Sequence, residues 1–234
     1  VKELTAPKGF ALDPSVKEVT VTADQKAVVT FKDLPQMDPV GILLGKVDAE
    51  TNQNKPQGSA TLQGAQFTVK YYAGLWAPNV DPAILGQTPV RTWVFQTDED
   101  GFTSYAKDYL VSGSELYLSP TGNPSLPLGT VTIQETKAPE GYLINNEMFV
   151  MQITAEGNDQ YVNTYNRPTV PEKVMKLDLV KRQEKTDIPI PGAKFEHTKP
   201  DGTKEILTTD EAGKLTLTGV QYGTHRITEI EVMD

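Results

Sequence analysis

The chain has 234 residues, a net charge of −9 and no cysteine, and these properties exclude several kinds of protein. The negative charge argues against electrostatic binding to nucleic acid or to anionic lipid. The lack of cysteine excludes disulfides, which small secreted β-domains often use for stability. No apolar run is long enough to cross a bilayer, so we expect no membrane insertion in this fragment. Seventeen prolines and eighteen glycines favour short strands and turns over helices.

The first part of the chain, residues 1–38, has the pattern of the C-terminal end of a β-domain. Glu3 to Phe10 follows the form Glu-x-x-Ala-Pro-x-Gly-aromatic. Residues 17–22 alternate as a strand does, and residues 27–33 predict a second strand. Because the chain opens on what resembles mid-strand sequence, we expect it to be a fragment of something longer.

A complete β-unit is predicted over residues 39–168. A polar loop follows its first strand, and residues 97–101 form a Gly/Asp turn. Residues 167–173 contain two prolines and predict a short, stiff linker. The alternation of apolar residues predicts strands at 42–47, 64–69, 131–135, 148–154 and 161–166.

The last part, residues 174–234, repeats four landmarks of the complete unit in the same order. These are a strand ending in lysine, a Gly-Ala-x-Phe segment, a Thr-Asp-Glu turn and an Ile-x-Glu strand. The chain stops before any closing strand of this unit. Repetition of this kind indicates a tandem array, and short strands separated by turns indicate all-β sandwiches. Only the complete unit carries two long loop insertions, at residues 71–92 and 102–127.

One face of the 131–135 strand combines aliphatic residues with an acid. Val131, Ile133 and Glu135 share that face, and Leu44 and Lys46 share a face of the earlier strand. A carboxyl group among apolar neighbours is protonated or needs a close partner. The pattern therefore predicts a buried lysine–glutamate pair.

The landmarks resemble the Cna protein B-type (prealbumin-like) domain of Gram-positive surface adhesins and pilins. The resemblance is carried by Glu-Thr-Lys-Ala-Pro-Glu-Gly-Tyr at residues 135–142, by Gly-Lys-Val-Asp-Ala-Glu-Thr at 45–51 and by Gly-Ala-Gln-Phe at 64–67. It implies tandem Ig-like/prealbumin-like β-sandwiches, one complete and two partial. In many members of this family a lysine forms an isopeptide bond with Asn or Asp, assisted by a buried glutamate.

The resemblance assigns these roles to particular residues. In the complete unit it implies a crosslink from Lys46 to Asn166, with Glu135 assisting; Asn163, on the opposite strand face, is the alternative acceptor. The matching positions in the partial units are Lys181 and Glu229 in the third and Glu3 and Asp33 in the first. The lysine of the first unit is absent from the chain, and the third unit lacks an acceptor strand.

The chemistry of this bond follows from burial. Burial lowers the pKa of a lysine and raises that of a carboxylic acid. A neutral Lys46 amine can then attack the Asn166 carboxamide, while protonated Glu135 stabilises the oxyanion and shuttles a proton to the departing ammonia. The plainer alternatives are a buried ion pair and a lysine that snorkels to water.

Other features admit a binding role or a structural one. Tyr71, Tyr72 and Trp76, in the first insertion, could form an adhesive surface, or the loop could pack against its own sandwich. His197 and His225 have no metal-ligand spacing and are expected to be surface strand residues. Residues 98–101 are expected to form a turn rather than a calcium site, since the full calcium-loop pattern is absent. We expect neither a metal nor a cofactor.

These observations favour a structural role rather than an enzymatic one. The expected function is a stalk or shaft segment of a cell-wall-anchored, extracellular adhesin or pilin, stabilised by isopeptide bonds. Its expected partners are neighbouring domains or pilin subunits. The alternative is an adhesin module whose 71–92 insertion contacts a host protein or glycan. A carbohydrate-active enzyme would need paired carboxylates in a cleft.

Overall fold

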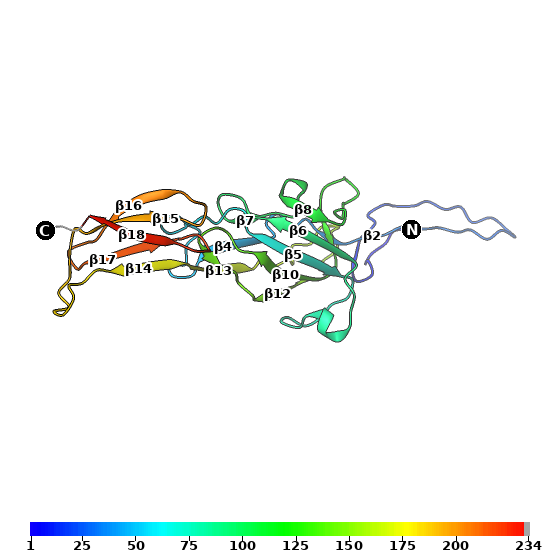
Figure 1. The fold of residues 1–234 in the computed structure, drawn as a ribbon. Coiled ribbons are helices and arrows are strands. Elements are labelled where there is room, and N and C mark those ends of the chain that lie inside the picture. The colour runs from blue at the N-terminus through cyan, green and yellow to red at the C-terminus, as the bar shows by residue number, and fades with distance from the viewer. Residues whose placement is uncertain (232–234) are drawn as a thin grey trace.

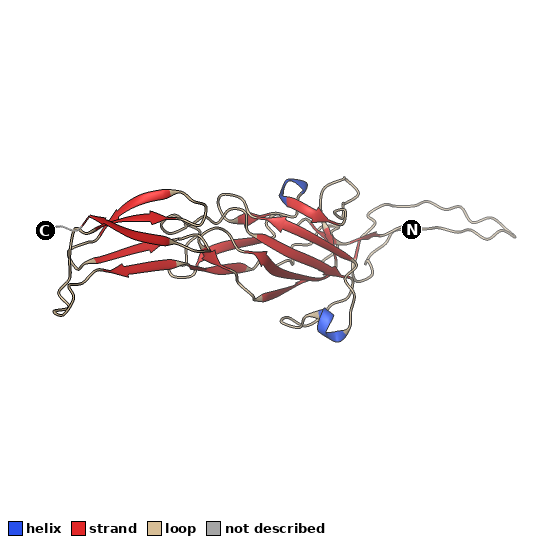
Figure 2. Ribbon diagram, viewed as in Figure 1, coloured by secondary structure: helices blue, strands red, loops and turns tan. Residues whose placement is uncertain are grey.

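A computed structural model describes residues 1–231 of the chain. The molecule is elongated, with the N-terminal arm at one end of its long axis and strands β14 to β18 at the other (Figure 1). Strands dominate, and the described residues contain two short 3-10 helices, η1 (Pro82–Leu85) and η2 (Lys107–Tyr109) (Figure 2). The all-β class predicted from the sequence is confirmed. No helix among the described residues is long and apolar enough to cross a membrane.

The second unit is a sandwich of two sheets. The larger sheet is antiparallel and has the strand order β12-β10-β5-β6-β8. Its inward side chains alternate with outward ones, as expected for a sheet that covers a core on one face. The bounds are β5 Gln66–Tyr72, β6 Arg91–Gln96, β8 Leu110–Gly113, β10 Gly129–Lys137 and β12 Met148–Ile153.

The smaller sheet joins the two ends of the unit. Its order is β11-β13-β4-β7, and β13 pairs with β4 in parallel, with Val170 opposite Lys46. The predicted linker at 167–173 is therefore wrong, because most of it forms strand β13, which closes this sheet. The bounds are β4 Leu44–Asp48, β7 Phe102–Thr103, β11 Tyr142–Leu143 and β13 Thr169–Val174.

The core lies between these sheets and is continuous. Fully buried aromatic and aliphatic side chains from β5, β6 and β10 face Leu44 of β4 and Val170 of β13. The 102–127 insertion adds to this core, because buried Tyr105 packs edge-on against Trp93 with ring centroids 5.3 Å apart. The predicted insertion therefore contributes to the sandwich instead of lying outside it.

The third unit repeats the second with fewer strands. β14 (Lys176–Val180) pairs with β17 (Lys214–Thr218), and β15 (Lys194–Thr198) lies between β16 (Lys204–Thr208) and β18 (Arg226–Glu231). The pairing of β15 with β18 matches that of β5 with β10, as the repeated landmarks predict.

The first unit has little regular structure. Short strands β1 (Phe10–Ala11) and β2 (Leu34–Pro35) pair with each other, and β3 (Met37–Asp38) pairs with β9 (Leu126–Pro127). The strands predicted at 17–22 and 27–33 are absent, and this segment runs as the extended arm at one end of the molecule (Figure 1). The arm has no sheet to join in this structure, so its alternating valines remain exposed.

Candidate functional site: a buried lysine between two glutamates

Lys46 is the only lysine among the described residues whose side chain is completely buried. Its Nζ atom contacts the carboxylate of Glu135 and lies 2.6 Å from Oε1 of Glu172. It also lies 4.8 Å from the centroid of the Phe67 ring. A single amine is thus enclosed by two acids and an aromatic face, away from water.

Strand periodicity explains how these charged groups reach the interior. Lys46 and Leu44 share the inward face of β4, and Glu135 continues the inward row of Val131 and Ile133 on β10. Glu172 is two residues beyond buried Val170 on β13 and faces the same way. Strands β4, β10 and β13 therefore meet at the Lys46 amine. Along the chain, β4 is the first strand of the smaller sheet and β13 is the last.

Glu135 is held from its other side by the backbone. Its Oε2 atom accepts a hydrogen bond from the amide nitrogen of Asn145 at 2.6 Å. The Asn145 side chain in turn donates to the carbonyl of Pro171, next to Glu172. The loop after the Ala-Pro-Glu-Gly-Tyr segment thus fixes both acids, a role for Asn145 that the sequence motif does not indicate.

The electrostatics of the site favour a shared proton. The pKa of Glu172 is raised to about 7, mainly by burial; Lys46 acts in the opposite direction, and the nearby Glu135 charge adds to the rise. Two carboxylates and one ammonium would leave an uncompensated buried charge, which is costly. Protonation of Glu172 removes that charge. The site therefore holds an amine beside a carboxylic acid, with a second carboxylate touching the amine.

The predicted acceptors are not at this site. Asn166 and Asn163 are both exposed, and Asn166 precedes β13, in which Val170 is the residue opposite Lys46. Glu172 occupies the position beside Lys46 that the family resemblance assigned to Asn166. The prediction of a linker at 167–173 left Glu172 out of the site. The two-residue spacing of Val170 and Glu172 could have indicated that both lie on the inward face of a strand.

The third unit brings its own predicted pair together. Lys181 Nζ lies 2.9 Å from Glu229 Oε2, but both side chains retain more than a quarter of their exposure. In the first unit, Glu3 accepts a hydrogen bond from the backbone of Asp13, and no contact between Glu3 and Asp33 is present among the described residues. Within residues 1–231, a fully enclosed Lys–Glu site is found in the second unit alone.

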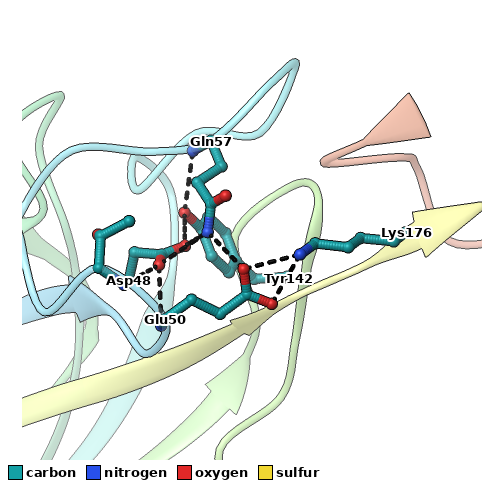
Figure 3. Close-up of polar contacts among 6 residues, drawn as sticks. Asp48, Glu50, Gln57, Tyr142 and Lys176 are labelled. Atoms are coloured by element: carbon teal, nitrogen blue, oxygen red, sulfur yellow. Dashed lines mark hydrogen bonds and ion pairs between the residues drawn. The ribbon is translucent and has the colours of Figure 1, made fainter. Parts of the chain in front are cut away.

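A second polar network fixes the Gly-Tyr end of the motif. The Tyr142 hydroxyl donates to Asp48 Oδ2 at 2.9 Å, and Gln57 donates to both Asp48 oxygens (Figure 3). Gln57 also bonds Glu50, which forms an ion pair with Lys176 of the third unit at 2.7 Å (Figure 3). These contacts connect the start of one unit to the start of the next.

The predicted aromatic binding surface is not formed as expected. Tyr71 and Tyr72 retain 3% and 1% of their exposure, because β5 points them inward or under the insertion. Trp76 is half-buried and packs edge-on against Tyr72. This is the alternative in which the loop packs against its own sandwich.

The remaining predictions concern the acidic turn, metal ligands and the histidines. Asp98 caps its own turn by accepting hydrogen bonds from the amides of Asp100 and Phe102, so the expected turn is present. No cluster of metal-ligating side chains occurs in the part of the chain that is described. The expectation for His197 is wrong, since it is 1% exposed and bonded on both ring nitrogens.

Two consecutive β-sandwiches, each with an inward Lys–Glu pair, define a tandem array of prealbumin-like domains. The sequence matches the SpaA prealbumin-like fold domain over residues 42–168 and again over 175–234, so the chain belongs to this family. The resemblance to prealbumin-like domains found in the sequence is thereby confirmed. No curated protein matches the chain significantly.

A comparison with solved structures finds the same fold in one of them and weaker similarity in others. The chain is similar to the Bacillus anthracis TIE protein, with 24% identity and a TM-score of 0.55, over 99% of this chain and 35% of that one. It also matches a C-terminal fragment of the pilus adhesin SpaC from Lactobacillus rhamnosus GG, with 16% identity and a TM-score of 0.42, over 82% and 76% of the two chains. GBS52, the minor pilin of Streptococcus agalactiae, matches with 14% identity and a TM-score of 0.28, over 81% and 82%.

Proposed function

We propose that this chain is a structural shaft or stalk segment of an extracellular, cell-wall-anchored adhesin or pilin of a Gram-positive bacterium. The main support for this structural role is the parallel pairing of β13 with β4 around the enclosed Lys46 site. Tension along the molecule would have to shear the last strand of the unit from the first. A structural part of this kind needs no catalytic turnover.

The proposal includes a covalent bond between Lys46 and Glu172. The Lys46 ammonium first gives a proton to the Glu135 carboxylate, and the resulting neutral amine attacks the side-chain carbonyl carbon of the protonated Glu172 carboxyl, forming a C–N bond. Glu135 gives that proton to the departing hydroxyl, which leaves as water, and takes up the second proton that the nitrogen loses. The bond forms once per molecule, as a maturation step.

Enclosure and position favour this reaction. Fixed alignment of two reactants can supply about 7–11 kcal/mol of the barrier. The resulting crosslink encloses nearly the whole second unit, and for a loop of roughly 100 residues the chain-entropy model predicts a stabilisation of about 5 kcal/mol. This gain suits a domain without disulfides.

Intact-mass measurement of the purified chain tests the bond and its acceptor together. A crosslink from Lys46 to Glu172 removes one water, about 18 Da, whereas a crosslink to Asn166 removes ammonia, about 17 Da. A digest that joins the Lys46 and Glu172 peptides identifies the acceptor. An unmodified mass means that the site is a buried ion cluster, and the covalent proposal then fails.

A second candidate function, binding of a host protein or glycan, is favoured by the exposed tip of the 71–92 insertion. Ile84 is 83% exposed and Leu85 56%, on a short turn that Asp81 caps at its start and Gly86 at its end. Exposed apolar residues on an ordered loop are typical of contact sites. Ile84→Ser and Leu85→Ser together would abolish binding to host cells or matrix if the tip is the contact.

A further inference from the structure

The joint between the second and third units contains a pair of hydrogen-bonded histidines. His197 Nε2 lies 2.7 Å from His225 Nδ1, and their rings stack with centroids 5.0 Å apart. His197 Nδ1 lies 2.9 Å from Glu205 Oε1, and His225 Nε2 lies 2.8 Å from the carbonyl oxygen of Gln221. We call this chain of four groups the histidine relay.

The relay connects to the contacts between the units. The Gln221 side chain donates to Glu140 of the second unit at 2.6 Å. The adjacent amides of Gly219 and Val220 donate to the carbonyl of Met175, and Ser59 of the second unit bonds the carbonyl of Gly219. Residues 219–225 thus hold the third unit against the second, and the relay holds residues 221–225 in place.

The charged groups around the histidines come from several elements. Glu205 on β16 also pairs with Lys199, at 3.3 Å, and Gln221 also reaches Asp201, at 3.3 Å. These groups and Glu140 line a cavity of about 330 Å³ between the units, with Ser59 on its far wall. Glu205 stays ionised, because the hydrogen bond from His197 lowers the pKa of its carboxyl.

The ends of the relay fix how many protons it carries. The Gln221 carbonyl only accepts, so His225 Nε2 carries a hydrogen; the Glu205 carboxylate also only accepts, so His197 Nδ1 carries one. One more hydrogen must lie between His197 Nε2 and His225 Nδ1. The two rings together therefore carry three hydrogens and a single positive charge.

A second positive charge is incompatible with this geometry. With both rings fully protonated, two N–H groups would point at each other across 2.7 Å. The hydrogen bond would be replaced by repulsion, and His225 would have to turn away. Since histidine changes charge between about pH 5 and 8, mild acid supplies this proton.

We infer that the His197–His225 pair is a pH-sensitive lock that loosens the joint between the second and third units in mild acid. The lock closes when the pair holds one charge and opens when it holds two. This inference rests on the relay alone and is independent of any crosslink at Lys46.

Hydrogen exchange of the whole chain tests the lock. Between pH 7.5 and 5.5, after correction for intrinsic exchange, the protection of the Ser59 and Met175 amides, which donate across the joint to Thr218 and Gly141, should fall by roughly tenfold. The amide of Val69, within the second-unit sheet, should keep its protection. In His225→Gln the amide oxygen can accept a hydrogen bond from a protonated His197, so no repulsion arises and the protection of Ser59 and Met175 should not change with pH.

The pH window separates the histidines from the acids near them. The carboxyl groups around the relay ordinarily titrate near pH 4, below the range used, whereas Glu172, with its pKa raised to about 7, titrates within it. His225→Gln leaves Glu172 unchanged, so the comparison with this variant separates the histidines from that acid. Imidazole nitrogen NMR at pH 7.5 adds a direct readout, with three hydrogens expected on the two rings: one on His197 Nδ1, one on His225 Nε2 and one between the two facing nitrogens. Constant protection in the unmodified chain, or an equal loss in His225→Gln, would overturn the inference.

Discussion

Glu172 Oε1 lies 2.6 Å from Lys46 Nζ because β13 runs parallel to β4 in one definite register. The register puts Val170 opposite Lys46, so the next inward residue of β13 reaches the amine. A shift of one residue would turn Glu172 outward. The identity of the residue at position 172 therefore determines what chemistry is available to the buried lysine.

Replacing Glu172 with glutamine should change the leaving group without removing the acceptor. Attack of Lys46 on a carboxamide expels ammonia, so the mass of Glu172→Gln should be about 17 Da below that of the unmodified variant chain. Tandem mass spectrometry of the crosslinked peptides measures this. Asn166→Ala is the matched control and should keep the 18 Da loss. Loss of the bond in Asn166→Ala alone would assign the acceptor to Asn166.

Replacing Glu135 with alanine should abolish the bond and lower the melting temperature sharply. The variant loses the group that transfers protons, and Lys46 keeps only Glu172 as a partner. Removal of one partner of a buried ion pair typically costs about 3–5 kcal/mol, in addition to the lost crosslink. Intact mass and calorimetry provide the measurement, with exposed Glu147→Gln as control. A bond that still forms in Glu135→Ala would contradict the assigned role.

The pH dependence of an uncrosslinked chain should show the buried acid. The pKa of Glu172 is raised to about 7 in the folded protein, above its value in the unfolded chain, mainly by burial. The folded state then binds more protons between about pH 4.5 and 7, so stability should fall as pH rises through that range. In Lys46→Met no bond can form, while the burial and the Glu135 charge that raise this pKa both remain, and urea unfolding should give a loss of about 1–3 kcal/mol. Stability that rises over this interval would show that Glu172 is ionised in the fold.

Much of the second unit followed from the sequence because its strands carry simple alternation. The inward positions of Lys46 and Glu135 could be predicted from their apolar neighbours, and the structure brings the two together. Glu172 could not be identified so easily, since Pro168 precedes its strand and Pro171 lies within it, and two prolines indicate a linker. Proline is tolerated at position 171 because β11 pairs with β13 only at Lys173 and Val174, which leaves position 171 with a neighbouring strand on one side.

Other parts depend on partners that sequence patterns do not specify. The alternation at residues 17–33 is genuine strand sequence, but a strand needs a neighbour, and the arm has none in this structure. His197 lies on a strand with outward charged neighbours, yet the Glu205 and His225 side chains cover it. Tyr71 and Tyr72 resembled an exposed aromatic surface, but β5 directs Tyr71 into the core and Tyr72 under the insertion, where it packs against Trp76.

Removing the Tyr142 hydroxyl should destabilise the second unit. In Tyr142→Phe, buried Asp48 loses the 2.9 Å hydrogen bond to its Oδ2 atom but keeps those from Gln57. A lost hydrogen bond to a buried charged group costs about 1–3 kcal/mol. Chemical denaturation measures the change. Tyr222→Phe is the control, because Tyr222 is 88% exposed and its hydroxyl faces water; equal effects of the two changes would refute the structural role of Asp48.

A methyl group at Gly141 should disrupt the joint between the second and third units. Gly141 and Gly202 both have φ of +86°, so alanine introduces the same backbone strain at either position. They differ in their surroundings, since a Cβ atom at Gly141 would lie 2.6 Å from Ala60 Cβ and 2.8 Å from the Gly219 carbonyl oxygen, whereas at Gly202 nothing lies within 4 Å. Backbone strain alone costs about 1 kcal/mol in both variants.

Gly141→Ala should therefore be the less stable of the two, and it should also bend or loosen the molecule. Ala60 and Gly219 belong to different units, and neither backbone can move away without separating the segments that Ser59 joins. Small-angle scattering should show a shorter maximum dimension or a broader distance distribution for Gly141→Ala and an unchanged profile for Gly202→Ala. If both variants scatter alike, the contact of Gly141 with the third unit does not hold the molecule straight.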